Sequence, residues 1–232
     1  MKMDPRKKSI WEESYEFWVN QSNGEIPKYR LHQIESLLPI LDKHFKFNKI
    51  KCIETGASHT FKNDGALGLM FAKACNLTEG EFHSVDLDEK VINNSKKFYE
   101  NYKLNVKSHL QDSVEFLNNT DFISNIVHLD SWDVDLKNPI PCALHGWKEF
   151  VAIEDKMSIG SILIVDDNWF GGTFVEWVYP HNPTERIDIT YPILGKGALI
   201  WHHIKDCKSN WVKLSEDIIG GNVKLVYKKY KQ

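Results

Sequence analysis

The sequence predicts an α/β protein built on a doubly wound, mostly parallel sheet of seven strands with helices on both faces. Between residues 49 and 167, short apolar runs alternate with longer helical segments, a pattern typical of a parallel sheet that is covered on both sides. After residue 167 this alternation stops. Two further strand-like stretches, 195–204 and 223–230, show no helical pattern between them, so we expect an antiparallel hairpin at one sheet edge.

The expected elements follow in chain order from these patterns. Two helices come first, at 9–22 and 29–45, and Pro27 lies between them. The strands of the parallel part are expected at 50–54, 82–86, 106–110, 126–130 and 161–167. The helices that connect them are expected at 65–75, 89–102, 113–118 and 143–157. The segment 168–194 is long and irregular, and loops of this kind often carry function.

We divide the chain into a helical N-terminal extension, residues 1–46, and one α/β domain, residues 47–232. A length of 232 residues is enough for a single hydrophobic core with a decorated edge. The extension is expected either to cover a bound cofactor or to contact a second copy of the chain in a homodimer. The sequence leaves both roles open.

Composition and charge limit the functions that this chain could have. Hydrophobic residues make up 42% and charged residues 26%, as in soluble globular proteins. The net charge of −3, from 29 basic and 32 acidic residues, gives no general attraction for phosphates, which argues against nucleic acid as a partner. No uninterrupted apolar stretch could span a membrane, and the four cysteines lack the CxxC spacing of zinc sites. We therefore expect a cytoplasmic protein that acts on a small molecule.

The first candidate binding motif follows the first expected strand, where Glu54, Gly56 and Ser58 stand in the run IETGAS. Doubly wound folds bind ligands beyond the carboxyl ends of their strands. Gly56 would allow a sharp turn and a close approach of the backbone to a ligand. Glu54 could accept hydrogen bonds from a cationic amino group. A single glycine is also compatible with an ordinary strand-to-helix turn.

The next two strands end in further acidic residues. Asp86 is placed to accept both ribose hydroxyls of an adenosine, whereas Asp88 is expected to cap the helix that follows. Asp112 and Ser113 come after the third strand. Asp112 either accepts a hydrogen bond from an adenine amino group or only caps its helix.

Three aspartates end two strands that we expect to be neighbours, Asp130 after one strand, and Asp166 and Asp167 after the other. Carboxylates within a few ångströms of one another repel, so some take up protons unless a cation neutralises them. Oxygen ligands of this type suit Mg²⁺, with Ca²⁺ or Mn²⁺ as alternatives. A carboxylate cluster in a cleft is also a common functional arrangement without metal. A third interpretation is one helix cap beside solvent-facing aspartates.

The chain from about residue 49 to residue 230 resembles the class I S-adenosylmethionine-dependent methyltransferases. The segment 54–58 stands at the first cofactor motif of that family, Asp86 at its ribose-binding acid, and 112–113 at its adenine-side motif. The resemblance implies a Rossmann-like methyltransferase fold with S-adenosyl-L-methionine as the cofactor. The residues it implies as cofactor contacts are Glu54, Gly56, Ser58, Asp86, Asp112, Ser113 and Asp130.

The stretches 145–150, 160–168 and 195–197 look like one branch of this family, the small-molecule and sugar O-methyltransferases of the macrolide-sugar and catechol types. In that branch an aspartate after the fourth strand and a pair after the fifth hold Mg²⁺. The resemblance therefore implies a metal site formed by Asp130, Asp166 and Asp167. If the register is shifted by one residue, Asn168 takes the place of the third ligand.

Two departures from the family affect the predicted mechanism. The first motif has Ser-His-Thr at 58–60 in place of further glycines, and Asp133 stands where the catechol type carries a lysine base. We expect methyl transfer to a hydroxyl of a small polar substrate, with Asp133 or His145 as the general base. A histidine within an amphipathic helix is also often a packed core or interface residue.

Other interpretations stay open at this point. A nicotinamide-dependent oxidoreductase or epimerase would need a glycine-rich run at 54–60, and a non-catalytic binding protein would have lost the cofactor residues. Lys196, between two glycines, either contacts a phosphate or carboxylate or lies solvated in a tight turn. The aromatic residues after the fifth strand either line a substrate pocket or anchor a long loop; they are Trp169, Phe170, Trp177 and Tyr179.

Overall fold

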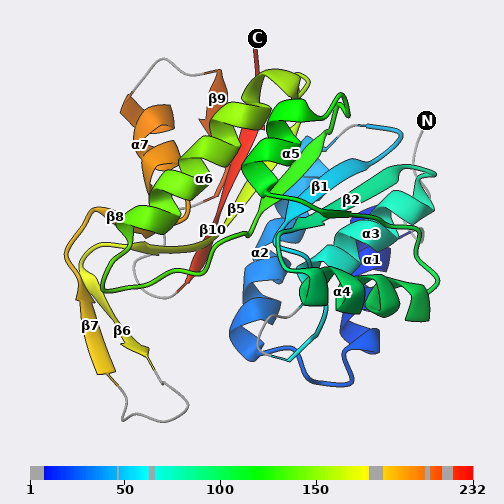
Figure 1. The fold of residues 1–232 in the computed structure, drawn as a ribbon, viewed down its shortest axis with the longest axis horizontal. Coiled ribbons are helices and arrows are strands. Elements are labelled where there is room, and N and C mark those ends of the chain that lie inside the picture. Colours follow the sequence, from blue (N-terminus) through cyan, green and yellow to red (C-terminus); the bar gives the residue numbers. More distant parts are fainter. Residues whose placement is uncertain are drawn as a thin grey trace.

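The computed structural model describes residues 8–45, 47–62, 66–177, 185–206, 210–215 and 222–231. Their main sheet has the strand order β3-β2-β1-β4-β5-β10-β9, and a short strand, β8, pairs with β5 outside this row (Figure 1). The strands are β1 Lys51–Thr55, β2 Glu81–Asp86, β3 Lys107–Leu110, β4 Ile126–Leu129, β5 Ile162–Phe170, β8 Ile193–Gly195, β9 Trp211–Lys213 and β10 Val223–Lys229. Strands β1 to β5 are parallel, whereas β10 runs antiparallel to β5 and β9. The predicted fold class is confirmed.

Helices cover both faces of this sheet (Figure 1). One face carries α1 Ile10–Gln21, α2 Lys28–His44, α3 Leu67–Leu77 and α4 Glu89–Asn101. The other face carries α5 Ser113–Asn119, α6 Ile140–Ile153, the short 3₁₀ turn Glu154–Lys156 and α7 Ala198–Asp206. Each group packs its apolar side chains into its own core cluster against the strands, as expected for a sheet buried on both faces.

The N-terminal helices pack directly on the first of these faces. Helix α1 begins at a capping box in which Ser9 and Glu12 satisfy each other's backbone amides. It buries Trp11 and Trp18 in the same cluster as α3, and the indole Nε1 of Trp18 donates to the backbone oxygen of Ala66 at 3.1 Å. Helix α2 runs beside β10, so it brings its polar side chains to the carboxyl end of the sheet.

The prediction of a strand at 195–204 is wrong, because most of that segment forms helix α7. Its buried residues, Ile200 and Trp201, face the core together with the partly buried Ile204, which is a helical rather than an alternating pattern. The edge hairpin is instead formed by β9 and β10. Strand β5 also continues to Phe170, three residues beyond the predicted end, because its last residues pair with β8.

The long segment after β5 contains a two-stranded antiparallel ribbon, β6 Thr173–Trp177 and β7 Glu185–Ile189, that projects from the body of the protein (Figure 1). Trp169 and Phe170 at its base are buried, so they anchor the ribbon rather than line a substrate pocket. Gly65, the first residue of the helix predicted at 65–75, and Tyr179 lie outside the described residues, as does the side chain of Trp177.

No helix in the part of the chain that the structure describes is both long and apolar enough to cross a membrane. The three described cysteines, Cys52, Cys75 and Cys142, are buried free thiols. Burial raises the pKa of the Cys142 thiol to about 11, so this group stays protonated and unreactive near neutral pH.

Candidate active site

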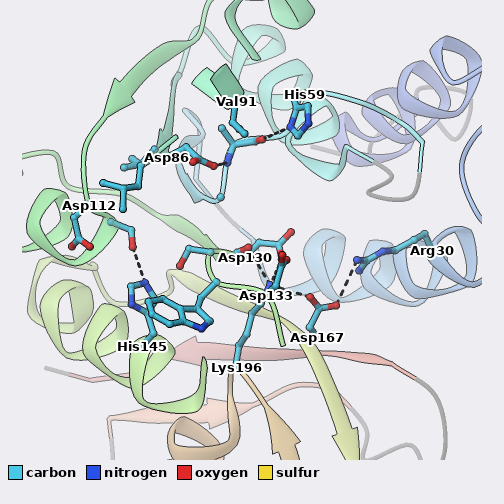
Figure 2. Close-up of a pocket in the computed structure, with 17 residues that line it drawn as sticks. Arg30, His59, Asp86, Val91, Asp112, Asp130, Asp133, His145, Asp167 and Lys196 are labelled. Carbon is cyan, nitrogen blue, oxygen red and sulfur yellow. Dashed lines mark hydrogen bonds and ion pairs between the residues drawn. The ribbon is translucent and has the colours of Figure 1, made fainter. Parts of the chain in front are cut away.

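A cavity of about 610 Å³ opens at the carboxyl ends of the parallel strands (Figure 2). It lies where the strand order reverses between β1 and β4, the place at which doubly wound folds bind ligands. One wall contains the loops after β1 and β2 and the start of α5. The opposite wall contains the loop after β4, the end of β5, and side chains from α2, α6 and the β8–α7 connection. Figure 2 shows Asp86 on the first wall and Lys196 on the second.

Gly56 makes the sharp turn that the sequence predicts at this rim. Its backbone has a φ of +80°, which is unfavourable for other residues. A Cβ atom at this position would lie 2.5 Å from the backbone oxygen of Asp130. Only glycine therefore lets the loop after β1 contact the loop after β4, and Gly56 lines the cavity as a result.

Glu54 and Ser58 lie behind this loop and do not line the cavity, which differs from the predicted contact between Glu54 and a cofactor. The Glu54 carboxylate is fully buried. It accepts hydrogen bonds from the Ser58 hydroxyl at 2.7 Å and the Ser58 amide at 3.1 Å, and further ones from Ser84 and Tyr99. Glu54 thus holds the shape of the loop from beneath, and the segment that faces the cavity is formed by Gly56, Ala57 and His59.

Asp86 lines the cavity and has a fixed orientation. Its Oδ2 accepts a hydrogen bond from the Ala57 amide at 2.9 Å, and its Oδ1 accepts one from the Asp88 amide at 2.8 Å. Each carboxylate oxygen can accept a second hydrogen bond, so Asp86 can still bind a diol. Asp88 caps α4 through the amides of Lys90 and Val91, as predicted.

Asp112 and Ser113 stand at the start of α5 on the same wall. Asp112 caps the helix by accepting a hydrogen bond from the Glu115 amide at 2.9 Å, which confirms the capping interpretation. Its side chain also borders the cavity, so a contact with an adenine ring stays a prediction. The Ser113 hydroxyl lies 3.0 Å from Nε2 of His145 and links the two walls.

The structure brings Asp130, Asp166 and Asp167 together, as the parallel strands predict, but basic side chains of the protein neutralise them. Lys196 pairs with Asp130 at 2.6 Å and with Asp167 at 2.9 Å. Arg30 pairs with Asp166 at 2.8 Å and lies 3.6 Å from Asp167. Lys224 forms a further ion pair with Asp166. Three carboxylates therefore face three basic side chains.

These pairs set the protonation of the cluster. Burial disfavours the charged form of Asp166, but Arg30 and Lys224 outweigh it and hold the pKa well below its usual range. Burial also disfavours the charged form of Asp167, but Lys196 outweighs burial and lowers the pKa of this carboxyl group. Burial raises the pKa of Asp130 in spite of Lys196, so Asp130 is the member that takes up a proton first. The surrounding carboxylates raise the pKa of Lys196, which stays an ammonium ion.

The side chains of this cluster do not fit the predicted Mg²⁺ site. Ligand atoms of His128, Asp130 and Asp166 do lie within 4.8 Å of one another, a spacing that could hold a metal ion. A divalent cation there would stand beside three positive groups that already occupy the carboxylate oxygens. Asn168 is not free to replace a ligand, because its amide binds the backbone oxygens of Val165 and Asp166 and the amide of Gly197. Asp130, Asp166 and Asp167 thus form an internal ion-pair cluster, and the predicted Mg²⁺ site stays a prediction that these contacts disfavour.

His145, one of the two predicted general bases, projects from α6 into the cavity (Figure 2). Its Nε2 lies 3.6 Å from the buried carboxylate of Glu149, one helical turn further along α6. Glu149 is held in place by a hydrogen bond from the Ser131 hydroxyl at 2.7 Å. The ring of Trp132 packs on the imidazole at 5.1 Å. The second predicted base, Asp133, also lines the cavity but is exposed.

Several residues that line the cavity or support its wall were missed by the sequence analysis. Arg30 comes from the N-terminal helix α2, 136 residues before its partner Asp166, and no local pattern marks it. Glu149 could have been found from the sequence, because its i, i+4 spacing from His145 places both side chains on one face of a helix. The backbone of Trp132 has a φ of +63°, a left-handed conformation that the amino-acid sequence does not reveal.

No protein-family model matches this sequence, and no curated protein sequence matches it. Solved structures do share its fold. The S-adenosylhomocysteine-bound methyltransferase PaMTH1 of Podospora anserina has a TM-score of 0.56 at 11% identity, covering 97% of this chain and 89% of that chain. An S-adenosylmethionine-dependent methyltransferase from Clostridium acetobutylicum ATCC 824 has a TM-score of 0.53 at 10% identity, covering 96% and 100%. A candidate rRNA methylase from Clostridium thermocellum has a TM-score of 0.57 at 12% identity, covering 85% and 97%.

These neighbours establish that the chain has the Rossmann-like fold of S-adenosylmethionine-dependent methyltransferases. At such low identity the likeness concerns the fold, and the activity of this chain has to be argued from its own cavity.

Replacing Gly56 by alanine tests the geometry of the rim. The added Cβ would collide with the Asp130 backbone, so we expect S-adenosylhomocysteine binding to weaken by about tenfold or more, in addition to a backbone strain of about 1–2 kcal/mol. Isothermal titration and thermal unfolding measure the two effects. Gly172→Ala is the matched control, because Gly172 has a φ of +84° with no atom near its Cβ position. Equal stability and equal binding in both variants would contradict the predicted clash.

Proposed function

We propose that this chain is an S-adenosyl-L-methionine-dependent methyltransferase that methylates a hydroxyl group of a small polar molecule, such as a sugar or a secondary metabolite. One observation carries the proposal. The cavity at the switch point has a wall with a fixed carboxylate and a close-approach glycine, and it faces a second wall with a histidine aimed inward. The solved methyltransferase structures of the same fold support it.

The first wall would bind the cofactor. Asp86 would accept hydrogen bonds from the two ribose hydroxyls, because the Ala57 and Asp88 amides already orient its oxygens. Gly56 would let the backbone approach the cofactor closely, and Val91 and Leu87 offer apolar contact. The bound cofactor supplies a methyl carbon that is activated by the positive charge of the sulfonium.

The second wall would hold the acceptor and remove its proton. As the acceptor oxygen forms its bond to the methyl carbon and the bond from carbon to sulfur breaks, His145 would take up the hydroxyl proton at Nδ1, because Nε2 faces Ser113 and Glu149. The buried carboxylate of Glu149 lies 3.6 Å from Nε2 and would stabilise the resulting imidazolium. Trp132 limits the rotation of the ring. We favour His145 over Asp133 as the base because Asp133 is exposed at the cavity rim.

Other functions fit the cavity less well. A nicotinamide-dependent enzyme would need more glycines in the loop after β1, where Gly56 stands alone between residues 54 and 60. A nucleic-acid acceptor, suggested by the rRNA methylase among the structural neighbours, would have to approach a chain with a net charge of −3. Asp112 and Asp133 add negative charge at the cavity itself. A non-catalytic role is disfavoured because Gly56, Asp86 and His145 all face one cavity.

Isothermal titration with S-adenosylhomocysteine tests the cofactor assignment. We expect wild-type protein to bind it, and Asp86→Ala to weaken binding by about tenfold or more because two hydrogen bonds to ribose are lost. Asp121→Ala serves as an exposed aspartate control remote from the cavity. No heat of binding from wild-type protein at millimolar ligand, together with binding of NAD under the same conditions, would exclude the methyltransferase proposal.

The proposed base is tested with labelled S-adenosylmethionine and a panel of small hydroxylated compounds. For any acceptor that is methylated, His145→Ala should lower kcat by about 10²–10⁴-fold while S-adenosylhomocysteine binding stays unchanged. Asp133→Asn is the paired variant and should retain most of the activity. The assignment would be reversed if Asp133→Asn lost activity and His145→Ala did not.

A further inference from the structure

The backbone around Lys196 is held in place on three sides. Strand β8 delivers it beside β5, where Gly195 pairs with Asn168 and adopts a φ of +123°. The Gly197 amide donates to Oδ1 of Asn168 at 2.7 Å. On the side of α6, a Cβ atom at Gly146 would lie 2.3 Å from the backbone oxygen of Lys196, so only a glycine fits there. The side chain therefore starts from a fixed position next to the rim of the cavity.

The ammonium group of Lys196 has three oxygen partners within the protein. It donates to the backbone oxygen of Asp130 at 3.0 Å and to Oδ1 of the same residue at 2.6 Å, and it lies 2.9 Å from Oδ2 of Asp167. An ammonium has three hydrogens, so each has an acceptor. The side chain is 3% exposed. Lys196 thus bridges the ends of β4 and β5 as a cation with oxygen ligands on both sides.

The remaining charges of the cluster leave no excess of negative charge for a metal ion. Arg30 and Lys224 neutralise Asp166. With Lys196 the cluster has three basic and three acidic groups. A divalent cation would be repelled unless one of the basic side chains left.

We propose that Lys196 is the built-in cation of this site: its ammonium occupies the space between Asp130 and Asp167 that a divalent metal would otherwise fill, and the site binds metal only when that ammonium is removed. The inference rests on the proposed methyltransferase function and deepens it. The acceptor is then not bound as a metal chelate, so two adjacent hydroxyls are not required of it. It is recognised by direct hydrogen bonds to the protein.

Electron paramagnetic resonance of Mn²⁺, used as the probe for a divalent metal, tests this directly. Wild-type protein saturated with S-adenosylhomocysteine should leave millimolar Mn²⁺ free in solution. Tight Mn²⁺ binding by the wild type that is lost in Asp130→Asn would overturn the inference. S-adenosylhomocysteine binding, measured in the same samples, reports separately on the methyltransferase proposal, so the two can fail independently.

The Lys196→Met variant tests the converse expectation, that the site binds a divalent metal once the ammonium is removed. It removes the ammonium and keeps the length of the side chain, so it should bind Mn²⁺ about tenfold more tightly than the wild type or better, and Mn²⁺ should raise its Tm. The double variant K196M/D130N should lose this response. Lys229→Met is the matched control, because Lys229 is about as buried as Lys196, but its ammonium donates to the backbone oxygen of Glu154 at 2.6 Å and lies 5.9 Å from the Trp211 ring. If the Lys196→Met variant folds but neither binds Mn²⁺ more tightly nor gains Tm with it, the inference is overturned. If this variant does not fold, the same measurements are made on Lys196→Gln.

Discussion

Neutralisation of three carboxylates, the buried Asp166 and the partly buried Asp130 and Asp167, by three basic side chains is the interaction on which the rest of this site depends. The basic partners come from α2, from the connection between β8 and α7, and from β10. Asp130 follows β4, and Asp166 and Asp167 lie within β5. Breaking one buried ion pair by removing one partner costs about 3–5 kcal/mol, because the other charge is left uncompensated. The cluster therefore ties the N-terminal helix and the C-terminal strand to the centre of the sheet at its carboxyl rim.

The carboxylates of the rim divide into supporting and ligand-facing groups. Glu54 is buried beneath the loop that follows β1, and its hydrogen bonds to Ser58, Ser84 and Tyr99 hold that loop in shape. Asp86 faces the cavity with lone pairs still available. Their positions explain this difference. Glu54 is fully buried and contacts only protein groups, whereas Asp86 lines the cavity and can contact a ligand. The same contrast separates Asp166, which is enclosed by cations, from the exposed Asp133.

Sequence patterns predicted the fold and the place of the cavity because both depend on local order along the chain. Parallel strands meet at one edge, so acidic residues at the ends of β2, β4 and β5 had to gather there. The metal prediction did not include the basic partners, because charge balance depends on residues that are distant in the sequence. Arg30 and Lys224 carry no local signal, and Lys196 was compatible with a solvated turn as well as with a carboxylate contact. Helix α7 was taken for a strand because its short apolar run does not reveal its period.

The most direct test of this account is a crystal structure of the protein grown with S-adenosylhomocysteine and MnCl₂, with anomalous differences measured at the manganese edge. The account predicts the adenosyl group against Gly56 and Asp86, and the ammonium of Lys196 between Asp130 and Asp167 with no anomalous peak beside it. A manganese peak between these two aspartates, with Lys196 turned away, would contradict the account.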